Sequence, residues 1–266
     1  IELDPKHEYA YRNRGLSKHN LEDYNGAIAD YTRAIELDPK DDVAYNNRGV
    51  SKGNLKDYNG AIADYTKAIE LDPNYTSAYN NRGLSKKNLK DYKGAIADYT
   101  RAIELDPNYP DAYNNRGISK KNLKDYKGAI ADYTRAIELD PKHEYAYKNR
   151  GLSKSELEDY YGATADYTRA IELDPKDDAA YNGRGNSKYN LEDYNGAIAD
   201  YTRAIELDPK HEYAYRNRGL SKLNLKDYYG AIADCTRAIE LDPNKAIGYR
   251  IIANLYYKIN DFTKAK

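Results

Sequence analysis

Proline recurs through this sequence at one fixed interval. It stands at positions 5, 39, 73, 107, 141, 175, 209 and 243, so successive members of the series are 34 residues apart. The residues before each of these prolines are nearly constant, and Ala-Ile-Glu-Leu-Asp stands both at 34–38 and at 102–106. A fixed period of this length is typical of solenoids, in which each unit buries its apolar face against its neighbours. The sequence therefore predicts an array of stacked units.

Two amphipathic helices are predicted in each unit. The second helix of the first full unit has apolar residues at the i, i+3, i+4 and i+7 spacing of one helical face. These residues are Tyr24, Ala27, Ile28, Tyr31, Ala34 and Ile35. Asp23 is placed to cap this helix, and Pro39 ends it because proline disfavours helical backbone in the preceding residue. In the first helix, Tyr11, Gly15 and Leu21 are expected to point inward.

Tyrosine must supply much of the core. The mean hydropathy is −0.99 and 32% of residues are charged, values close to those of disordered chains. However, 31 residues are Tyr, and each ring can bury a large apolar surface although hydropathy scales count it as polar. Trp and Met are absent and Phe occurs once. Tyr, Ile, Leu and Ala are therefore expected to fill the interior.

The repeated pattern resembles the tetratricopeptide repeat (TPR) family over essentially the whole chain. The matching residues in the first full unit are Tyr11, Gly15, Ala27, Tyr31, Ala34 and Pro39. The resemblance implies an all-α fold, a right-handed α-solenoid of stacked antiparallel helix pairs (a TPR superhelix) whose first helices line the concave side. Residues 1–266 are expected to form a single array, with full repeats at 8–41, 42–75, 76–109, 110–143, 144–177, 178–211 and 212–245. Residues 1–7 are expected to be the tail of a preceding repeat, and residues 246–266 a partial repeat.

Each full repeat carries an arginine in its first helix, at a place where the family often has leucine, and an aspartate in its second helix. The arginines are Arg14, Arg48, Arg82, Arg116, Arg150, Arg184 and Arg218, and the aspartates are Asp30, Asp64, Asp98, Asp132, Asp166, Asp200 and Asp234. An unpaired guanidinium inside a helix interface is costly, so we predict a repeated, partly buried ion pair with a structural role. The alternative is an arginine that points into solvent or into the groove.

No residue is predicted to be catalytic, to bind a metal or to hold a cofactor, and the chain is predicted not to be an enzyme. His7, His143 and His211 occupy equivalent inter-repeat turns, and copies in separate repeats are expected to lie too far apart to converge on a metal. The only cysteine, Cys235, stands where other repeats carry tyrosine on the apolar stripe, so it is interpreted as a small buried hydrophobe.

Charge and hydropathy exclude two classes of partner. The net charge is −1, with 42 basic and 43 acidic residues, whereas a nucleic-acid binder needs a basic stripe. No run of 18 apolar residues and no signal-peptide pattern occurs, so neither a nucleic acid nor a membrane is expected as a partner. The compartment stays undetermined: the family resemblance favours the cytoplasm, and a filament-forming protein would favour the outside of the cell.

A row of asparagines is the first candidate binding feature. Its members are Asn13, Asn47, Asn81, Asn115, Asn149 and Asn217, on the face of the first helix opposite its packing residues. An amide offers a donor and an acceptor together, so it can bind a peptide backbone without reading its sequence. The row resembles the asparagine ladder with which some members of the family hold extended peptides. The alternative is that these amides bond neighbouring repeats or cap turns.

Positions beside the asparagines vary between otherwise copied repeats. One position carries Tyr9, Tyr145 and Tyr213, and another carries Lys87 and Lys121. Selectivity can reside in such variable positions, although relaxed constraint produces the same pattern. The lysines make the middle of the array locally basic, which favours an acidic segment there.

The leading functional hypothesis is a non-enzymatic scaffold whose concave groove binds an extended peptide or a helix of a partner protein. The alternative is a structural protomer that assembles head-to-tail into a filament through unfinished half-repeats at both ends, in an extracellular, glycan-decorated form. The repeated threonines, such as Thr32, would be the sugar acceptors, although a solvated helix face explains them equally. A designed consensus array with no biological partner is the third reading.

Overall fold

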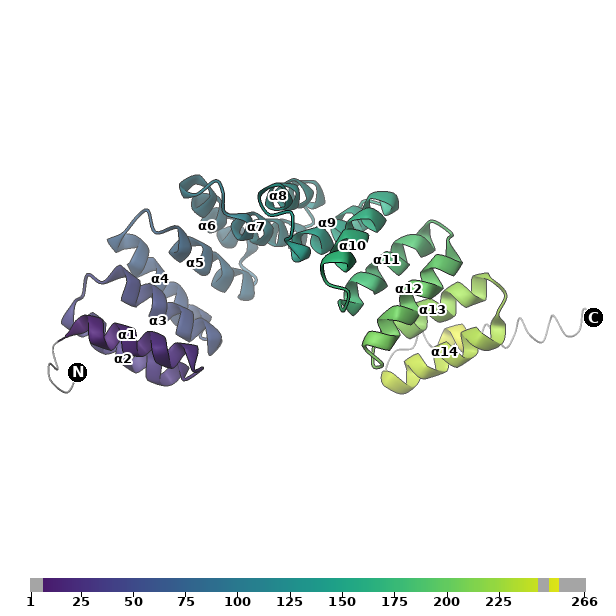
Figure 1. Cartoon of the computed structure of the whole chain (residues 1–266), viewed down its shortest axis with the longest axis horizontal. Coiled ribbons are helices and arrows are strands. Elements are labelled where there is room, and N and C mark those ends of the chain that lie inside the picture. Colours follow the sequence, from purple (N-terminus) through teal and green to yellow (C-terminus); the bar gives the residue numbers. More distant parts are fainter. Residues whose placement is uncertain (1–6, 244–248, 254–266) are drawn as a thin grey trace, which may run out of the picture. The chain divides into compact units, whose positions relative to one another are not determined.

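The computed structural model describes residues 7–243 and 249–253, and the described part contains fourteen labelled α-helices. The chain divides into two compact units, residues 1–140 and 141–266, and Figure 1 shows the helices of each unit following one another in chain order. The first unit contains α1 (Glu8–Asn20), α2 (Tyr24–Leu37), α3 (Asp42–Asn54), α4 (Tyr58–Leu71), α5 (Thr76–Asn88), α6 (Tyr92–Leu105), α7 (Pro110–Asn122) and α8 (Tyr126–Leu139). The second contains α9 (Glu144–Glu156), α10 (Tyr160–Leu173), α11 (Asp178–Asn190), α12 (Tyr194–Leu207), α13 (Glu212–Asn224) and α14 (Tyr228–Leu241).

The helices pack in pairs. In the first unit, α1 packs on α2, α3 on α4, α5 on α6 and α7 on α8, and α2, α4 and α6 each also pack on the first helix of the next repeat. The second unit repeats this arrangement from α9 to α14. The predicted all-α fold of stacked helix pairs is therefore confirmed. Within the described ranges, no helix has the length and apolar character that a bilayer crossing requires.

Local sequence signals set the helix ends. Asp23 caps α2, as predicted, because its Oδ1 accepts a hydrogen bond of 2.9 Å from the backbone nitrogen of Gly26. Helix α2 ends at Leu37, and its C-cap residue Asp38 is extended and precedes Pro39. The turn between the two helices needs a residue with left-handed backbone, and Glu22 adopts φ 61° there. The other six repeats place Lys or Glu at this position with a φ between 62° and 64°.

Small residues form the core together with one tyrosine in each of the first six full repeats, and Cys235 takes the place of that tyrosine in the seventh. Ala27 and Ala34 are fully buried, and the Tyr31 side chain lies against Gly15. A Cβ at Gly15 would stand 2.8 Å from Cε1 of Tyr31, so only glycine allows this contact. The expectation that Leu21 points inward is wrong. Leu21 is the C-cap residue that follows α1, and 80% of its surface is exposed.

A buried aspartate joins the two helices of every repeat. In the third repeat, Asp98 Oδ1 lies 2.7 Å from Arg82 Nη2, and its Oδ2 lies 2.7 Å from Lys86 Nζ. The same three-residue cluster occurs in all seven full repeats. The predicted arginine–aspartate pair is therefore confirmed, and the lysine is an additional member. In the first cluster, burial raises the pKa of Asp30, but hydrogen bonds from Arg14 and Lys18 outweigh this effect, so the net pKa is lowered.

The same arginine also connects neighbouring repeats. Arg82 Nη1 donates to Thr66 Oγ1 of the preceding repeat at 3.2 Å, and that hydroxyl donates to the carbonyl of Ile62 at 2.7 Å. Equivalent arginine–threonine bonds form in four other repeats. These threonine hydroxyls are hydrogen-bonded within the fold, which corrects the expectation of a merely solvated threonine row and disfavours it as a sugar acceptor.

Candidate functional site

Pockets form where the first helices of neighbouring repeats lie side by side. In the first unit, a pocket of about 260 Å³ is lined by side chains of α3, α4 and α5. Val50 and Asn54 of α3 face Asn81 and Leu84 of α5 across it, and Tyr65 of α4 also lines it. The first helices thus present apolar and amide groups together to the space between them. We refer to this pocket and its counterparts in the second unit as the groove pockets.

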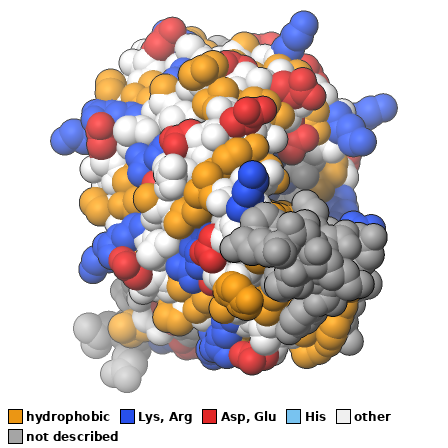
Figure 2. Space-filling model, turned by 90° about the vertical axis from the view of Figure 1, so that its right-hand side faces the viewer, with side chains coloured by type: hydrophobic (Ala, Val, Ile, Leu, Met, Phe, Trp, Pro, Cys, Tyr) orange, Lys and Arg blue, Asp and Glu red, His pale blue; other side chains and the backbone are white. Residues whose placement is uncertain are grey.

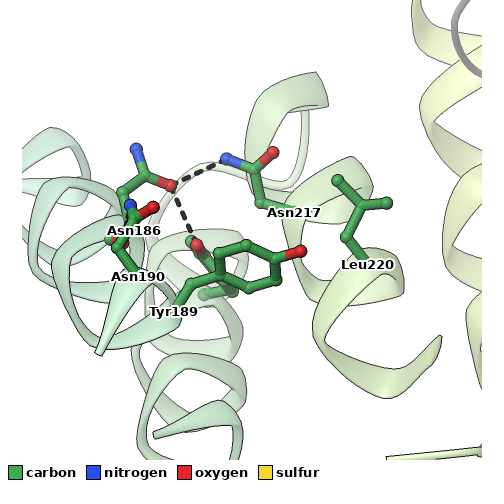
Figure 3. A pocket seen from close by; sticks show the side chains of 6 residues that line it. Asn186, Tyr189, Asn190, Asn217 and Leu220 are labelled. Carbon is green, nitrogen blue, oxygen red and sulfur yellow. Dashed lines mark hydrogen bonds between the residues drawn. The ribbon is translucent and has the colours of Figure 1, made fainter. Parts of the chain in front are cut away.

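Two groove pockets of the second unit lie on either side of α11. One, of about 330 Å³, is lined from α11, α12 and α13, and Figure 3 shows its side chains. The other, of about 300 Å³, is lined from α9, α10, the turn between those two helices, and α11. Asn186 and Asn190 of α11 line both pockets. The side chains of one helix therefore separate two adjacent cavities.

The predicted asparagine row bonds neighbouring repeats at several of its members. Asn81 Nδ2 donates to Asn46 Oδ1 at 3.2 Å, and Asn115 Nδ2 donates to Asn80 Oδ1 at 3.3 Å. Asn46 and Asn80 are buried, so these bonds fix the orientation of the Asn81 and Asn115 amides against the protein interior. The side-chain oxygens of Asn81 and Asn115 accept no hydrogen bond within the described ranges. Each amide therefore has a defined orientation and retains an acceptor.

The other members of the row differ in their surroundings. Asn217 lines the larger pocket of the second unit and bonds Asn186, whereas Asn13 is exposed on α1. Asn47 accepts a hydrogen bond of 3.3 Å from Asn46, and Asn149 is half-buried and engaged. Of the six predicted asparagines, Asn81 and Asn217 line groove pockets.

The three predicted tyrosines lie away from these pockets. Tyr9, Tyr145 and Tyr213 stand at the starts of α1, α9 and α13, where 49–56% of their surface is exposed. Each ring stacks against a cation one helical turn later. The contacts are Tyr9 with Arg12 at 4.9 Å, Tyr145 with Lys148 at 5.3 Å, and Tyr213 with Arg216 at 4.9 Å.

Those cations partly serve the stacking of repeats. Arg12 Nη1 and Lys148 Nζ bind the aspartates that cap the next repeat, at 3.0 Å from Asp41 and 2.5 Å from Asp177. Tyr9 and Tyr145 therefore cover inter-repeat ion pairs at the edge of the first helices, whereas Arg216 beside Tyr213 lies 3.8 Å from Glu212 of the same helix. Their role in binding stays a prediction.

The two predicted lysines stand near the ends of α5 and α7, and both are half-buried. Burial lowers the pKa of Lys87. Lys121 is engaged with other groups of the protein. The face drawn in Figure 2 has basic, acidic and apolar side chains interspersed, as the balanced composition suggests. Neither lysine lines the pockets described above, and their role also stays a prediction.

Several groove residues were seen in the sequence only as exceptions to the repeat. Gly183 interrupts the asparagine row, and in the structure a Cβ there would stand 2.5 Å from Cζ of Tyr167. The tyrosine ring has taken the place of the missing side chain. Asn186 replaces the aliphatic residue of other repeats, and Glu156 replaces an asparagine. Departures from a copied unit were the available signal for these three positions.

The chemically reactive side chains serve structure. Cys235 is fully buried, and burial raises its pKa to about 11, which removes the thiolate at neutral pH. His7, His143 and His211 cap α1, α9 and α13 by accepting a backbone hydrogen bond at 3.3–3.4 Å. The His143 and His211 side chains are half-buried. Among residues 7–243 and 249–253, no group of His, Cys, Asp or Glu side chains is arranged to hold a metal ion.

Comparison with known proteins identifies the repeat. Models of the tetratricopeptide repeat match residues 8–41, 43–75, 76–109, 110–143, 145–177, 179–211 and 212–245. No protein with a curated description matches the sequence.

Solved structures share this architecture. YrrB, whose structure is described as a TPR protein with an unusual peptide-binding site, is 25% identical with a TM-score of 0.59, covering 69% of this chain and 95% of its own. The C-terminal part of a TPR repeat-containing protein from Cytophaga hutchinsonii is 17% identical with a TM-score of 0.72, covering 90% and 98%. A chain in the APC/C hetero-tetramer Cut9-Hcn1 is 18% identical with a TM-score of 0.71, covering 96% and 50%.

Proposed function

Because the chain belongs to the tetratricopeptide repeat family, we propose that it is a non-enzymatic scaffold that binds an extended peptide segment of a partner protein along its groove pockets. An extended segment exposes a backbone donor and acceptor at each residue, and its side chains alternate in direction. A surface that binds it needs fixed amide groups beside cavities of side-chain size. The groove pockets combine these two features.

The observation that carries the proposal is the fixed orientation of Asn81 beside a pocket. Its amide nitrogen is held by the buried Asn46 of the preceding repeat, and its oxygen is left without a donor in the described structure. An amide held in this way loses little side-chain freedom when a peptide binds, so less entropy opposes binding. The bond to the neighbouring repeat therefore prepares the asparagine for a ligand, and both roles that the sequence allowed are compatible.

The similarity to YrrB supports the same conclusion. That protein has a peptide-binding site and shares the repeat over 95% of its own length at 25% identity. The filament alternative has no such support. Its contact surfaces are the expected half-repeats at residues 1–7 and 246–266, most of which lie outside the described residues, and head-to-tail assembly stays a prediction.

The decisive test is peptide binding by an asparagine variant. A phage library of random dodecapeptides would be selected on the protein, and the affinity of an enriched synthetic peptide measured by fluorescence anisotropy. Removing the two hydrogen-bonding amides in Asn81→Ala/Asn115→Ala should weaken binding about thirtyfold, since each bond contributes about 1 kcal/mol. Helical circular dichroism would establish that the variant is folded.

The matched control places the same substitutions outside the groove. Asn25 and Asn59 are exposed at the starts of α2 and α4 and line none of the pockets described. Asn25→Ala/Asn59→Ala should leave the affinity unchanged. Equal affinity of the groove variant and the control variant would refute backbone capture by the asparagine row. Failure of the library to enrich any peptide would refute the proposed function itself.

A further inference from the structure

The repeat at 178–211 and the one before it differ from the others on the side of the groove pockets. Asn186 stands where the other full repeats carry Leu, Val or Ile, and Tyr189 where most carry a smaller or a basic residue. In the preceding repeat, Glu156 replaces an asparagine that recurs in the other six full repeats. These residues line the two pockets on either side of α11, so the departures from the repeat concentrate at one place.

Hydrogen bonds fix the Asn186 amide in the pocket between α11 and α13. Arg216, which can only donate, lies 3.4 Å from the Asn217 oxygen, so the Asn217 nitrogen faces Asn186 and donates to its oxygen at 2.9 Å. The Tyr201 hydroxyl donates to the same oxygen at 2.8 Å, and Figure 3 shows both bonds. Both lone pairs of that oxygen are therefore used.

The Asn186 side-chain nitrogen is a free donor in this pocket. In Figure 3 it lies on the opposite side of the amide from the two dashed bonds, and no acceptor for it occurs in the described ranges. The Asn190 side-chain nitrogen donates to the backbone carbonyl of Asn186 at 2.8 Å, which leaves the Asn190 side-chain oxygen to accept. Tyr189 and Leu220 add apolar surface. An uncharged donor and acceptor beside apolar walls match the carboxamide of glutamine or asparagine.

The pocket between α9 and α11 has the opposite electrostatic character. Glu156 and Glu158 line it together with Tyr160 and Tyr167. Neither carboxylate has an ion-pair partner in the described part of the chain. The nearest basic residue in the sequence, Lys154, is bound to the buried Asp166 at 2.8 Å. Two unpaired carboxylates beside aromatic rings attract a cationic side chain.

The fold does not require acidic residues at these two positions. Glu158 occupies the left-handed turn position with φ 62°, and Lys124 and Lys226 occupy the same position with φ 63°. Asparagine stands at the place of Glu156 in neighbouring repeats, for example Asn122. The negative charge is therefore a property of this pocket and not of the repeat.

We infer that the two pockets form one composite subsite, which reads a lysine or arginine and a glutamine or asparagine in the same extended peptide. Packed helices lie about 10 Å apart and an extended chain advances about 3.4 Å per residue, so the two side chains should stand two or four residues apart, the spacings near this distance that place both on one side of the peptide. Asn186 and Asn190, shared by both pockets, lie under the connecting backbone. The inference rests on the proposed peptide-binding function and adds the side chains selected.

The test uses substitutions that other repeats already contain. Glu156→Asn/Glu158→Lys removes the acidic charge, and Asn186→Leu restores the aliphatic residue, so each variant keeps a side chain that this fold accommodates elsewhere. Glu22→Lys is the matched control, because it reverses a charge at the same turn position of the first repeat. The wild-type protein and each variant would be used to select the same random dodecapeptide phage library.

The expected result is enrichment on the wild-type protein of peptides with Lys or Arg two or four positions from Gln or Asn. Replacing the cation by norleucine in a synthetic enriched peptide should weaken binding to the wild type about fivefold in low salt, because two rim ion pairs are lost. The effect should shrink as salt rises and vanish on Glu156→Asn/Glu158→Lys, but persist on Glu22→Lys. Asn186→Leu should abolish only the preference for the carboxamide.

Two results would overturn the inference in distinguishable ways. Enriched peptides that bind the wild type and Glu156→Asn/Glu158→Lys equally, yet lose affinity for Asn81→Ala/Asn115→Ala, would refute the composite subsite and leave the proposed function standing. A library that enriches no peptide on the wild type would refute both.

Discussion

Substituting Asp98 by asparagine should destabilise the array far more than removing any exposed charge in the same repeat. The Asp98 side chain is 5% exposed and accepts three charge-assisted hydrogen bonds, from Arg82 Nε at 3.0 Å, Arg82 Nη2 at 2.7 Å and Lys86 Nζ at 2.7 Å. Asparagine keeps the shape but leaves two cations, 17% and 22% exposed, without a counter-charge.

The magnitude follows from this burial. Breaking a buried pair by removing one partner costs about 3–5 kcal/mol, and the partial exposure of the two cations places the expected cost near the lower end, at about 3 kcal/mol. The control is Glu104→Gln. Its carboxylate pairs with Arg101 at 3.1 Å on the surface, where the side chains are 57% and 44% exposed, so the expected cost is about 0.5 kcal/mol.

Hydrogen exchange measured by mass spectrometry suits this comparison, because solenoids open locally and a single unfolding free energy is not defined for them. A loss of about 3 kcal/mol predicts exchange about 150-fold faster in α5 and α6. Part of the loss should reach α4, because Arg82 also binds Thr66. Equal exchange in Asp98→Asn and Glu104→Gln would refute the reasoning that the buried cluster holds each repeat together.

Three further predictions concern the core. Burial raises the pKa of the Tyr31 hydroxyl to about 12, above its usual 10, and raises the pKa of four counterparts. The contribution of these neutral tyrosines to the stability of the fold is therefore complete below pH 10. It is lost as the pH rises to about 12 and beyond. Circular dichroism and absorbance at 295 nm should show unfolding and tyrosine ionisation together. Gly117→Ala, with a Cβ 2.6 Å from a ring carbon, should lower the local opening free energy of α7 and α8 by about 2 kcal/mol in hydrogen exchange, and Gly151→Ala, at 3.3 Å, should lower that of α9 and α10 by less than half of that. Cys235 should react with Ellman's reagent only after unfolding, and reaction with the native protein would contradict its burial.

Features that depend on short stretches of sequence were predictable. The caps at Asp23 and its counterparts and the helix stops before proline involve residues within four positions of one another. The Arg82–Asp98 pair was predictable because an unpaired charge in a helix interface is costly, so an opposite charge is expected beside it. Lys86 had a signal as well, since a residue four positions after Arg82 lies on the same helical face. Leu21 was misassigned because the apolar pattern does not reveal that the helix ends at that residue.

Features that depend on the approach of neighbouring repeats were not predictable. The bond from Asn81 to Asn46 joins residues 35 positions apart. The contact of Tyr167 with Gly183 depends on the orientation of the Tyr167 ring relative to the next repeat. The sequence indicated which positions vary, but not that Asn186, Tyr189, Glu156 and Glu158 line two pockets that share a wall. Such groupings follow from packing distances between helices, which the period alone does not specify.

Photo-cross-linking of a selected peptide tests the central claim most directly. The peptide would carry benzoylphenylalanine at successive positions, and the cross-linked residues would be mapped by mass spectrometry. Binding along the groove pockets predicts cross-links on the first helices, at residues such as Leu84 of α5 and Leu220 of α13. Cross-links confined to exposed side chains of the second helices, such as Arg101 or Glu104 of α6, would contradict the claim.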